Sequence, residues 1–135
     1  MASIDLKDAY LQIPIHPRSR KYLRFVAGDK TYQFKVLCFG LSTAPQVFTR
    51  VMAPVSAILH KEGIRMSRYL DDWLIRASSL QDLCHARDRV LQVCRMLGIQ
   101  VNFDKSDLVP SQRKVYLGMV LDSLTLKASP TPQRV

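Results

Sequence analysis

Cysteine is scarce in this chain of 135 residues, and its three cysteines, Cys38, Cys84 and Cys94, show no paired spacing. An odd count without paired spacing argues against a disulfide framework and indicates a reducing compartment. The three histidines do not join the cysteines in a zinc-ligand pattern. No apolar run approaches the roughly 18 residues of a membrane span, and no signal peptide is visible. These absences predict a soluble, intracellular protein, in the cytoplasm or the nucleus, without a membrane partner.

Acidic residues are also few: 11 Asp and Glu stand against 20 Lys and Arg, which gives a formal net charge of +9. A basic excess of this size favours an anionic partner, and nucleic acid fits best. Part of the excess is concentrated at Arg18, Arg20, Lys21 and Arg24, a cluster that is suited to phosphate contacts. A solvated basic loop explains the same cluster. With 47% apolar residues, the chain is large enough for one domain with a buried core.

Two adjacent carboxylates, Asp71 and Asp72, follow Tyr69 and Leu70 between two strand-like runs. This places them at the tip of a tight hairpin, where Asn-Gly or Asp-Gly is favoured and neighbouring negative charges repel. A third carboxylate, Asp5, ends another strand-like run. A bound cation would relieve the repulsion, and Mg²⁺ prefers hard oxygen ligands. The pattern indicates a two-metal site, although a solvated hairpin tip also carries such pairs.

Five segments, in chain order, carry a more specific signal. They are Ser3 to Ile15, Phe39 to Phe48, Tyr69 to Asp72, Leu97 to Lys105 and Val115 to Gly118. In this order they resemble the motifs of the reverse transcriptases of retroelements, from the first catalytic motif through the nucleotide pocket and the Tyr-x-Asp-Asp box to the primer-gripping hairpin. Within that family, Trp73 to Ile75 and Leu117 to Ser123 look most like DIRS-type retrotransposons, with gypsy-type elements as the near alternative.

The resemblance implies an α+β fold, a polymerase palm in which a mostly antiparallel sheet carries two helices on one face. It implies part of the fingers and no thumb. Residues 1–127 would form this palm with partial fingers, truncated at both ends. Residues 128–135 would form a linker-like, loose tail, because a Ser-Pro-Thr-Pro run cannot sit in a central strand.

Local patterns predict the strands. Residues 1–6 form the first strand, and residues 22–27 and 31–36 form a hairpin around a Gly-Asp turn. Val115, Leu117, Met119 and Leu121 recur at alternate positions, so residues 115–121 are expected to form one strand, which turns at residues 122–123 and returns over residues 124–127.

Two long helices are predicted between these strands. Ser42 or Thr43 caps the first, and Pro54 inside it should bend or divide it. Ser79 caps the second, and Gly98 ends it. Apolar residues at helical spacing should face the core. They are Val47, Phe48, Val51, Met52, Val55 and Leu59 in the first helix, and Leu80, Leu83, Cys84, Leu91, Cys94 and Leu97 in the second.

The activity that the resemblance implies is RNA-directed DNA polymerisation, the two-metal transfer of a deoxynucleotide onto a primer 3′-hydroxyl. Asp5 and Asp71 would bridge two Mg²⁺ ions, with Mn²⁺ as an alternative, and Asp72 would help hold the ion that activates the hydroxyl. The backbone carbonyl of Leu6 would be a further ligand. Lys105 matches a lysine that protonates the departing pyrophosphate or steadies the triphosphate; a surface lysine also fits this position.

A nucleotide pocket is implied as well, and Leu6 belongs to it. Tyr10 matches an aromatic gate whose ring lies under the sugar and leaves no room for a 2′-hydroxyl; a core tyrosine is the alternative. Asp8 matches a position near the triphosphate, where a solvated acid fits equally well. Phe39 and Gly40 match the pocket motif, in which glycine lets the backbone approach the nucleotide.

The implied partners are an RNA or DNA template with its primer, and deoxynucleoside triphosphates. Five residues are expected to contact the primer, and the core of an ordinary hairpin would explain the apolar residues among them equally well. The missing fingers, thumb and ribonuclease H segments of a larger polyprotein would supply much of the phosphate contact area, so the chain alone should polymerise weakly or not at all. The residues expected at the primer are Tyr69, Leu70, Tyr116, Leu117 and Gly118.

Two other classes of function stay open. One is a catalytically inactive or domesticated palm fragment that binds nucleic acid, and the other is an interaction domain that keeps the palm as a scaffold. Both would survive loss of the three carboxylates. An RNA-dependent RNA polymerase is a further alternative, but its usual Gly-Asp-Asp box differs from Tyr69 to Asp72, and Tyr10 opposes ribonucleotides.

Overall fold

Three antiparallel strands form the sheet that carries the acidic residues. β1 (Ala2–Asp5) and β4 (Arg65–Tyr69) both pair with β5 (Asp72–Arg76), so the strand order is β1-β5-β4. The structure is a computed structural model that describes residues 1–134. Alternate residues of β1 and β5, such as Ile4 and Ile75, are buried in the main core. The predicted first strand is therefore confirmed.

The first long helix, α1 (Ala44–Lys61), follows Thr43 and has Pro45 in its first turn. It runs undivided past Pro54, so the predicted division is wrong and the bend stays a prediction. Its buried stripe is centred on Phe48, Met52, Val55 and Leu59, as the periodicity predicted. Val51 is 46% exposed and does not belong to that stripe. At 100° per residue, Val51 lies about 60° to the side of Phe48, on the margin of the face that meets the sheet.

The second long helix is α2 (Leu80–Leu97), and its predicted ends are confirmed. The Ser79 side chain accepts a hydrogen bond from the Asp82 backbone N–H at 3.1 Å, and Gly98 ends the helix with φ +72°. Leu80 and Leu97 were predicted to be buried, but they are 68% and 56% exposed. An 18-residue helix is about 27 Å long, whereas a five-residue strand spans about 17 Å, so both helix ends extend past the sheet.

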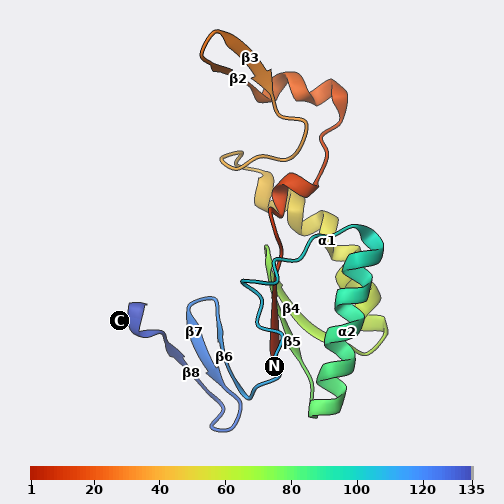
Figure 1. Cartoon of the computed structure of the whole chain (residues 1–135), viewed down its shortest axis with the longest axis vertical. Coiled ribbons are helices and arrows are strands. Elements are labelled where there is room, and N and C mark those ends of the chain that lie inside the picture. Colours follow the sequence, from red (N-terminus) through yellow and green to blue (C-terminus); the bar gives the residue numbers. More distant parts are fainter. Residues whose placement is uncertain (135) are drawn as a thin grey trace.

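Both helices lie on the same side of the three-stranded sheet (Figure 1). Their apolar faces share one core with the sheet residues Ile4, Met66, Trp73 and Ile75. The opposite face of the sheet is left to carry polar residues near Asp5. Within residues 1–134, no helix has both the length and the hydropathy that crossing a bilayer requires. The predicted α+β palm with two helices on one face is confirmed.

A separate lobe extends from the end of the sheet where β1 finishes (Figure 1). After the short 3₁₀ helix η1 (Tyr10–Gln12), a second 3₁₀ helix, η2 (Pro17–Leu23), leads into the antiparallel pair β2 (Arg24–Ala27) and β3 (Lys30–Gln33). The predicted hairpin around Gly28 and Asp29 is confirmed, with shorter strands than expected. Every residue of β2 and β3 is exposed. We call residues 17–35 the hairpin lobe.

The C-terminal strands form a second small sheet of order β6-β7-β8, made of β6 (Arg113–Tyr116), β7 (Met119–Asp122) and β8 (Lys127–Pro130), followed by the 3₁₀ helix η3 (Pro132–Arg134). The prediction of one strand over residues 115–121 is wrong. Tyr116 pairs with Met119, and the two residues between them, Leu117 and Gly118, have φ +53° and +74°. Positive φ at both central positions is typical of a two-residue hairpin turn.

The predicted loose tail is also wrong for its first residues, because Ala128, Ser129 and Pro130 pair with β7. Pro130 ends an edge strand, which agrees with its predicted exclusion from a central strand. A domain boundary after residue 127 stays a prediction.

Candidate active site

Strand register brings Asp5 and Asp72 together. Asp5 is the antiparallel partner of Asp72, one position after the buried pair Ile4 and Trp73. Because successive side chains alternate between faces, Asp5 and Asp72 lie on the sheet face that is turned away from the helices. Directly opposed residues have Cβ atoms about 5 Å apart. Their carboxylates therefore lie close together at this end of the sheet.

Asp71 is held next to this pair by the backbone. Its carbonyl oxygen accepts a hydrogen bond from the Leu6 N–H at 2.9 Å, which joins the end of β1 to the turn between β4 and β5. Leu70, the other turn residue, has φ +53°, a costly conformation for a residue with a side chain. The indole Nε1–H of the fully buried Trp73 donates to the Leu70 carbonyl at 3.2 Å. Trp73 thus stabilises the turn, a role that the sequence did not reveal.

The three carboxylates concentrate negative charge. Burial raises the pKa of Asp72 to about 6, with further contributions from its hydrogen bond to Asp5 and from the charges of Asp71 and Asp5. Burial also raises the pKa of Asp71; a backbone hydrogen bond opposes this, the charge of Asp5 adds to it, and Lys105 opposes it. The raised pKa values mean that the ionised carboxylates are unfavourable here, and a bound cation would stabilise them.

The oxygen donors fit a divalent ion in chemistry, but they are not arranged as a finished ligand set. Among residues 1–134, no group of three or more Asp, Glu, His or Cys side chains converges on one ligand position. Burial and the neighbouring Asp5 and Asp71 raise the pKa of Asp72 instead. Metal binding at Asp5, Leu6, Asp71 and Asp72 stays a prediction, and it requires that a metal ion displace the proton that the raised pKa favours on Asp72.

A segment far along the chain fixes the backbone of Asp5. The Asp5 N–H donates to Ser106 Oγ at 2.9 Å, and the Asn102 N–H donates to the Asp5 carbonyl at 2.8 Å. Ser106 Oγ also donates to the Asn102 carbonyl at 2.6 Å. Both backbone polar groups of Asp5 are therefore satisfied by one loop. The same loop carries Lys105, so its position is tied to that of the carboxylates.

Replacing Ser106 with alanine should loosen this connection. We expect the free energy of unfolding to fall by about 1 to 3 kcal/mol, because the part-buried Asp5 N–H loses its acceptor. Ser106→Thr, which keeps the hydroxyl, should lose much less, and Ser78→Ala at an exposed serine should change nothing. Urea denaturation of the three variants measures the difference, and equal stability of Ser106→Ala and the unaltered chain would contradict the account.

Two cavities meet at the carboxylates. The first, of about 430 Å³, contains four of the predicted nucleotide residues, Leu6, Asp8, Tyr10 and Phe39. It also contains Asp5, Leu70, Asp71 and Lys105. The second, of about 220 Å³, brings two of the predicted primer residues, Tyr116 and Leu117, to Asp5, Asp72 and Lys105. Lys105 and Asp5 thus line both cavities, and most of the predicted site residues are brought together.

Tyr10 lies against two other aromatic rings. Its ring centroid is 5.1 Å from that of Phe39 and 5.5 Å from that of Phe48. Burial raises the pKa of Tyr10, and the charges of Asp71 and Tyr69 raise it further, so its hydroxyl stays protonated at neutral pH. The ring therefore packs against two others and lines the cavity that contains Asp71.

Tyr116 is also connected to the acidic pair. Its hydroxyl donates to the Asp72 carbonyl oxygen at 3.0 Å. Burial raises the pKa of Tyr116, the charge of Asp72 raises it further, and Arg76 opposes the shift. A protonated hydroxyl is what this hydrogen bond requires. The β6–β7 hairpin is thereby attached to the sheet beside the carboxylates.

Other predicted residues lie at the edge of the site. Tyr69 is 58% exposed at the end of β4, and Gly118 forms the β6–β7 turn. Asp8 is exposed and has φ +47°. Gly40 does not line either cavity; its φ of +87° explains the glycine, since a Cβ there would meet no atom within 4 Å but would strain the backbone. Its predicted approach to a nucleotide stays a prediction.

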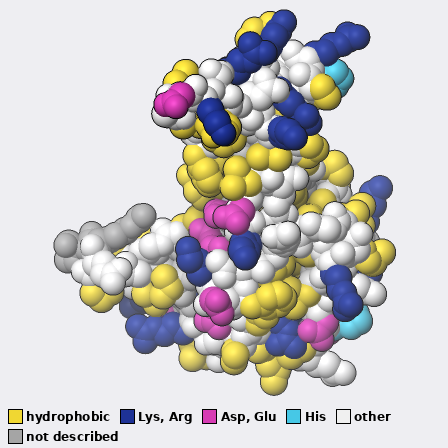
Figure 2. Space-filling model, turned by 45° about the horizontal axis from the view of Figure 1, so that its top comes forward, with side chains coloured by type: hydrophobic (Ala, Val, Ile, Leu, Met, Phe, Trp, Pro, Cys, Tyr) yellow, Lys and Arg dark blue, Asp and Glu magenta, His cyan; other side chains and the backbone are white. Residues whose placement is uncertain are grey.

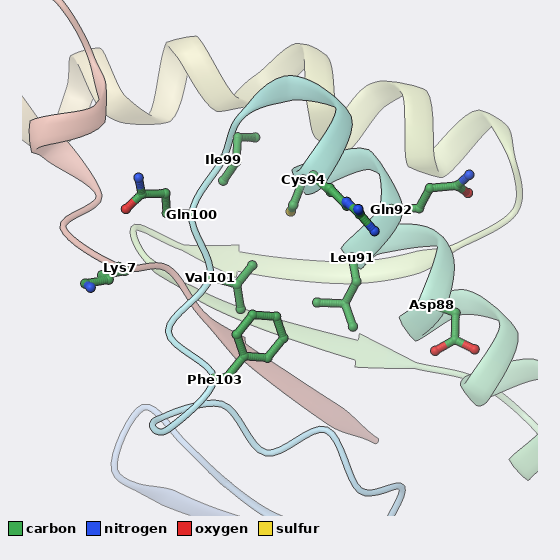
Figure 3. A pocket seen from close by; sticks show the side chains of 10 residues that line it. Lys7, Asp88, Leu91, Gln92, Cys94, Ile99, Gln100, Val101 and Phe103 are labelled. Atoms are coloured by element: carbon green, nitrogen blue, oxygen red, sulfur yellow. The ribbon is translucent and has the colours of Figure 1, made fainter.

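A larger cavity, of about 690 Å³, lies elsewhere, between α2 and the chain that follows it. Figure 3 shows Leu91, Val101 and Phe103 pointing toward one another there. It contains no pair of carboxylates and none of the predicted site residues. Choosing a candidate site by cavity volume alone would therefore have missed the acidic residues.

Residues 1–121 match the model of the family described as reverse transcriptase (RNA-dependent DNA polymerase). The chain belongs to this family, as its motifs predicted. In its relatives the family forms part of much longer proteins, of which this chain spans a small fraction.

Two viral proteins and one solved structure illustrate the similarity. The chain is 30% identical over 120 residues to the genome polyprotein of Petunia vein clearing virus (isolate Shepherd), covering 87% of this chain and 5% of that protein. It is 30% identical over 131 residues to Protein P of Duck hepatitis B virus (strain China), covering 93% of this chain and 16% of that protein. The foamy viral protease-reverse transcriptase in complex with RNA/DNA hybrid superposes with a TM-score of 0.84 at 21% identity. The superposition covers 98% of this chain and 17% of that one. That last likeness supports the fold.

Proposed function

We propose that this chain is the palm of an RNA-directed DNA polymerase that adds deoxynucleotides to a primer 3′-hydroxyl. The observation that carries the proposal is the register that opposes Asp5 and Asp72 beside the Asp71 turn. Membership of the reverse transcriptase family supports it. The two cavities that meet at these carboxylates give separate places for an incoming nucleotide and a primer end.

The proposed chemistry follows from where charge develops. Nucleotidyl transfer builds negative charge on the attacking and the leaving oxygen, and two divalent ions, Mg²⁺ or Mn²⁺, stabilise both when bound. Asp5 and Asp71 would hold both ions, Asp72 would hold the ion on the primer side, and the Leu6 carbonyl would add an oxygen. The Leu6 N–H and the Trp73 indole keep the turn in place for this purpose.

Lys105 would act on the leaving group. Lys105 lines the same cavity as Asp71, and its charge partly opposes the rise in the pKa of that carboxyl, so its charge reaches the site. From there it can donate a proton to the departing pyrophosphate or hold the triphosphate. Asp8 and Phe39 would border the same nucleotide, and Tyr10 would exclude a 2′-hydroxyl with its ring.

The proposed macromolecular partner is a primer paired with an RNA or DNA template. The structural neighbours in the foamy viral protease-reverse transcriptase were solved with an RNA/DNA hybrid and with dsDNA. In this chain, Tyr116 and Leu117 border the cavity at Asp72 and would support the primer end, with Tyr69, Leu70 and Gly118 alongside. The net charge of +9 favours binding to phosphates.

We further propose that the chain derives from a DIRS-type retrotransposon, with a gypsy-type element as the alternative. The support is the amino-acid sequence of the segments Trp73 to Ile75 and Leu117 to Ser123. A phylogenetic tree of reverse transcriptase palms tests this directly. A position among gypsy-type sequences, or among pararetroviral polymerases, would contradict the assignment.

Primer extension on an RNA template, with Mg²⁺ and deoxynucleoside triphosphates, tests the proposed activity. The chain should be assayed alone and joined to the fingers and thumb segments that complete a polymerase. We expect weak or no extension by the chain alone and clear extension by the completed enzyme. Absence of extension by a folded, completed enzyme would overturn the proposal and favour a palm that binds nucleic acid without catalysis.

Magnesium should stabilise the folded chain in a pH-dependent way. The folded-state pKa of Asp72, about 6, lies above the ordinary value of 3.8, so the contribution of Asp72 to stability without metal is present at low pH and is lost as pH rises between these values. Mg²⁺ competes with that proton. We expect millimolar Mg²⁺ to raise Tm by about 2 to 5 °C near pH 7.5 and by less near pH 5.

The matched variants are Asp72→Asn and Asp104→Asn. The first should raise Tm without metal at neutral pH and reduce the gain from Mg²⁺, whereas the second, at an exposed aspartate outside both cavities, should change neither. Differential scanning calorimetry measures both effects. A gain from Mg²⁺ that is the same in all three chains would contradict metal binding at Asp72.

A further inference from the structure

One lysine of the C-terminal sheet is buried. Lys114 lies in β6, and its side chain is only 3% exposed. Its Nζ is 2.6 Å from Asp107 Oδ2, and it donates a hydrogen bond to the Val109 carbonyl at 2.6 Å. A buried ammonium is costly unless a carboxylate and hydrogen bonds compensate it, and both are present here. Additional protein around the chain can only bury this group further.

The setting of Lys114 differs from that of the charges at the surface. Figure 2 shows acidic and basic side chains next to one another in the middle of one face, below the hairpin lobe. Surface pairs contribute little, because water screens them. Lys114 instead occupies the inward-facing position of β6 between two exposed residues, Arg113 and Val115. Apolar residues often replace a buried ion pair without loss of stability, so a lysine at this position indicates a role in aligning the elements that it joins.

Asp107 connects Lys114 to the strand that carries Asp5. The Asp107 N–H donates to the Ser3 carbonyl at 3.0 Å, and the Asp107 carbonyl accepts from the Ser3 N–H at 2.9 Å. Asp5 follows Ser3 by two residues in β1, and Lys105 precedes Asp107 by two residues. The carboxylate that pairs with Lys114 therefore belongs to the loop that holds Asp5 and carries Lys105.

The strand β6 is attached to the main sheet at a second point. Tyr116 comes two residues after Lys114, so both side chains lie on the same face of β6. The Tyr116 hydroxyl donates to the Asp72 carbonyl at 3.0 Å, and β6 lies beside β1 (Figure 1). Lys114 thus fixes β6 to the loop that carries Lys105, and Tyr116 fixes it to the strand that begins with Asp72.

We propose that Lys114 is a positioning residue, whose ion pair with Asp107 aligns the β6–β7 hairpin on the primer side with the Lys105 loop on the nucleotide side. The inference rests on the proposed function, since nucleotidyl transfer is what makes this alignment matter. Lys114 lines neither of the cavities at the carboxylates, so it acts through other residues. Its effect passes through Asp107 to Lys105 and along β6 to Tyr116.

Replacing Lys114 with methionine in the completed polymerase tests the proposal. Methionine keeps a long, flexible side chain but removes the ammonium, and the half-exposed Asp107 carboxylate is then hydrated. We expect Tm to change by less than about 4 °C. The single-turnover rate at saturating deoxynucleotide should fall at least about tenfold, because a small displacement of the primer end slows the chemical step strongly. The nucleotide concentration at half-maximal rate should stay within about threefold, since the nucleotide cavity is not altered.

Lys61→Met is the matched control. It makes the same change at an exposed lysine in the last turn of α1, outside both cavities, and should keep the rate within about twofold. If Lys114→Met does not fold, Lys114→Gln carries the test, because it keeps a donor for Asp107 or Val109; its rate should be at least about threefold lower than that of the unaltered enzyme. A folded Lys114 variant with an unchanged rate, whatever its half-maximal concentration, would overturn the proposal.

Asp107→Asn shows whether Lys114 acts through Asp107. This variant leaves the buried ammonium without its carboxylate, so its Tm should fall, and the double variant Lys114→Met/Asp107→Asn should recover most of that loss. The rate of the double variant should lie within about twofold of that of Lys114→Met, because both substitutions remove the same contact. Rate losses that multiply would show that the two residues act independently and would overturn the connection.

Hydrogen exchange followed by mass spectrometry, without metal ions, nucleotide or primer, gives a readout other than activity. In Lys114→Met, the amides of residues 105–109 and 113–116 should exchange at least about tenfold faster, whereas those of α1 should not change. Unchanged exchange, or faster exchange throughout the palm, would overturn the positioning role. The two proposals fail separately. Absence of extension by the unaltered completed enzyme counts against the catalytic proposal, whereas equal extension by that enzyme and by Lys114→Met counts against this inference.

Discussion

Asp71→Asn should reduce primer extension by the completed polymerase at least about a thousandfold. The substitution keeps the shape of the side chain but removes the charge that is proposed to hold both ions, and several kcal/mol of transition-state stabilisation correspond to that factor. The turn itself should survive, because the Asp71 backbone carbonyl still accepts from the Leu6 N–H. Single-turnover extension with saturating deoxynucleotide measures the chemical step.

Asp104→Asn is the control for this experiment, since it makes the same chemical change one residue before Lys105 and outside both cavities. It should retain at least about half of the rate. If Asp71→Asn kept a comparable rate, the carboxylates would not be the catalytic centre. Extension that needed no divalent ion would count against the account in the same way.

Tyr10→Val should relax the choice of sugar. In the unaltered polymerase the ring would block the 2′-hydroxyl of a ribonucleotide, and its position is fixed by contacts with Phe39 and Phe48. We expect the preference for deoxynucleotides over ribonucleotides, expressed as a ratio of kcat/KM values, to fall roughly a hundredfold. Steady-state incorporation of dCTP and CTP opposite guanine gives this ratio.

Tyr10→Phe separates the ring from its hydroxyl. Because the proposed exclusion is steric, this variant should keep the preference within about threefold. Loss of the preference in Tyr10→Phe, or its retention in Tyr10→Val, would show that the ring does not act as the gate and would favour the alternative of a core tyrosine.

The features predicted correctly from the sequence are those that depend on local chemistry. The ends of α2 follow from Ser79, whose side chain caps the first turn, and from Gly98, which adopts a left-handed conformation. Burial depends on neighbouring elements, so Leu80 and Leu97 were placed wrongly although their spacing is helical. The strand predicted over residues 115–121 failed because alternation does not reveal a turn. Gly118 was the available signal for it.

The site was predictable in part for a similar reason. Asp5 ends one strand-like run and Asp72 begins another, and the antiparallel pairing of those strands opposes them. Ser106 carries no motif, and its bond to Asp5 joins residues 101 positions apart, so only the folded chain reveals it. The bond from the Trp73 indole to the Leu70 carbonyl depends on a buried side-chain orientation that no local pattern gives.

Anomalous diffraction from Mn²⁺ tests the central claim most directly. Crystals of the completed polymerase, with primer, template and a non-hydrolysable deoxynucleotide, should give anomalous peaks bounded by the carboxylates of Asp5 and Asp71, with Asp72 at the peak nearer the primer. These peaks should disappear in Asp71→Asn. Peaks only at other places, or carboxylates of Asp5 and Asp71 without a peak between them at saturating Mn²⁺, would contradict the account.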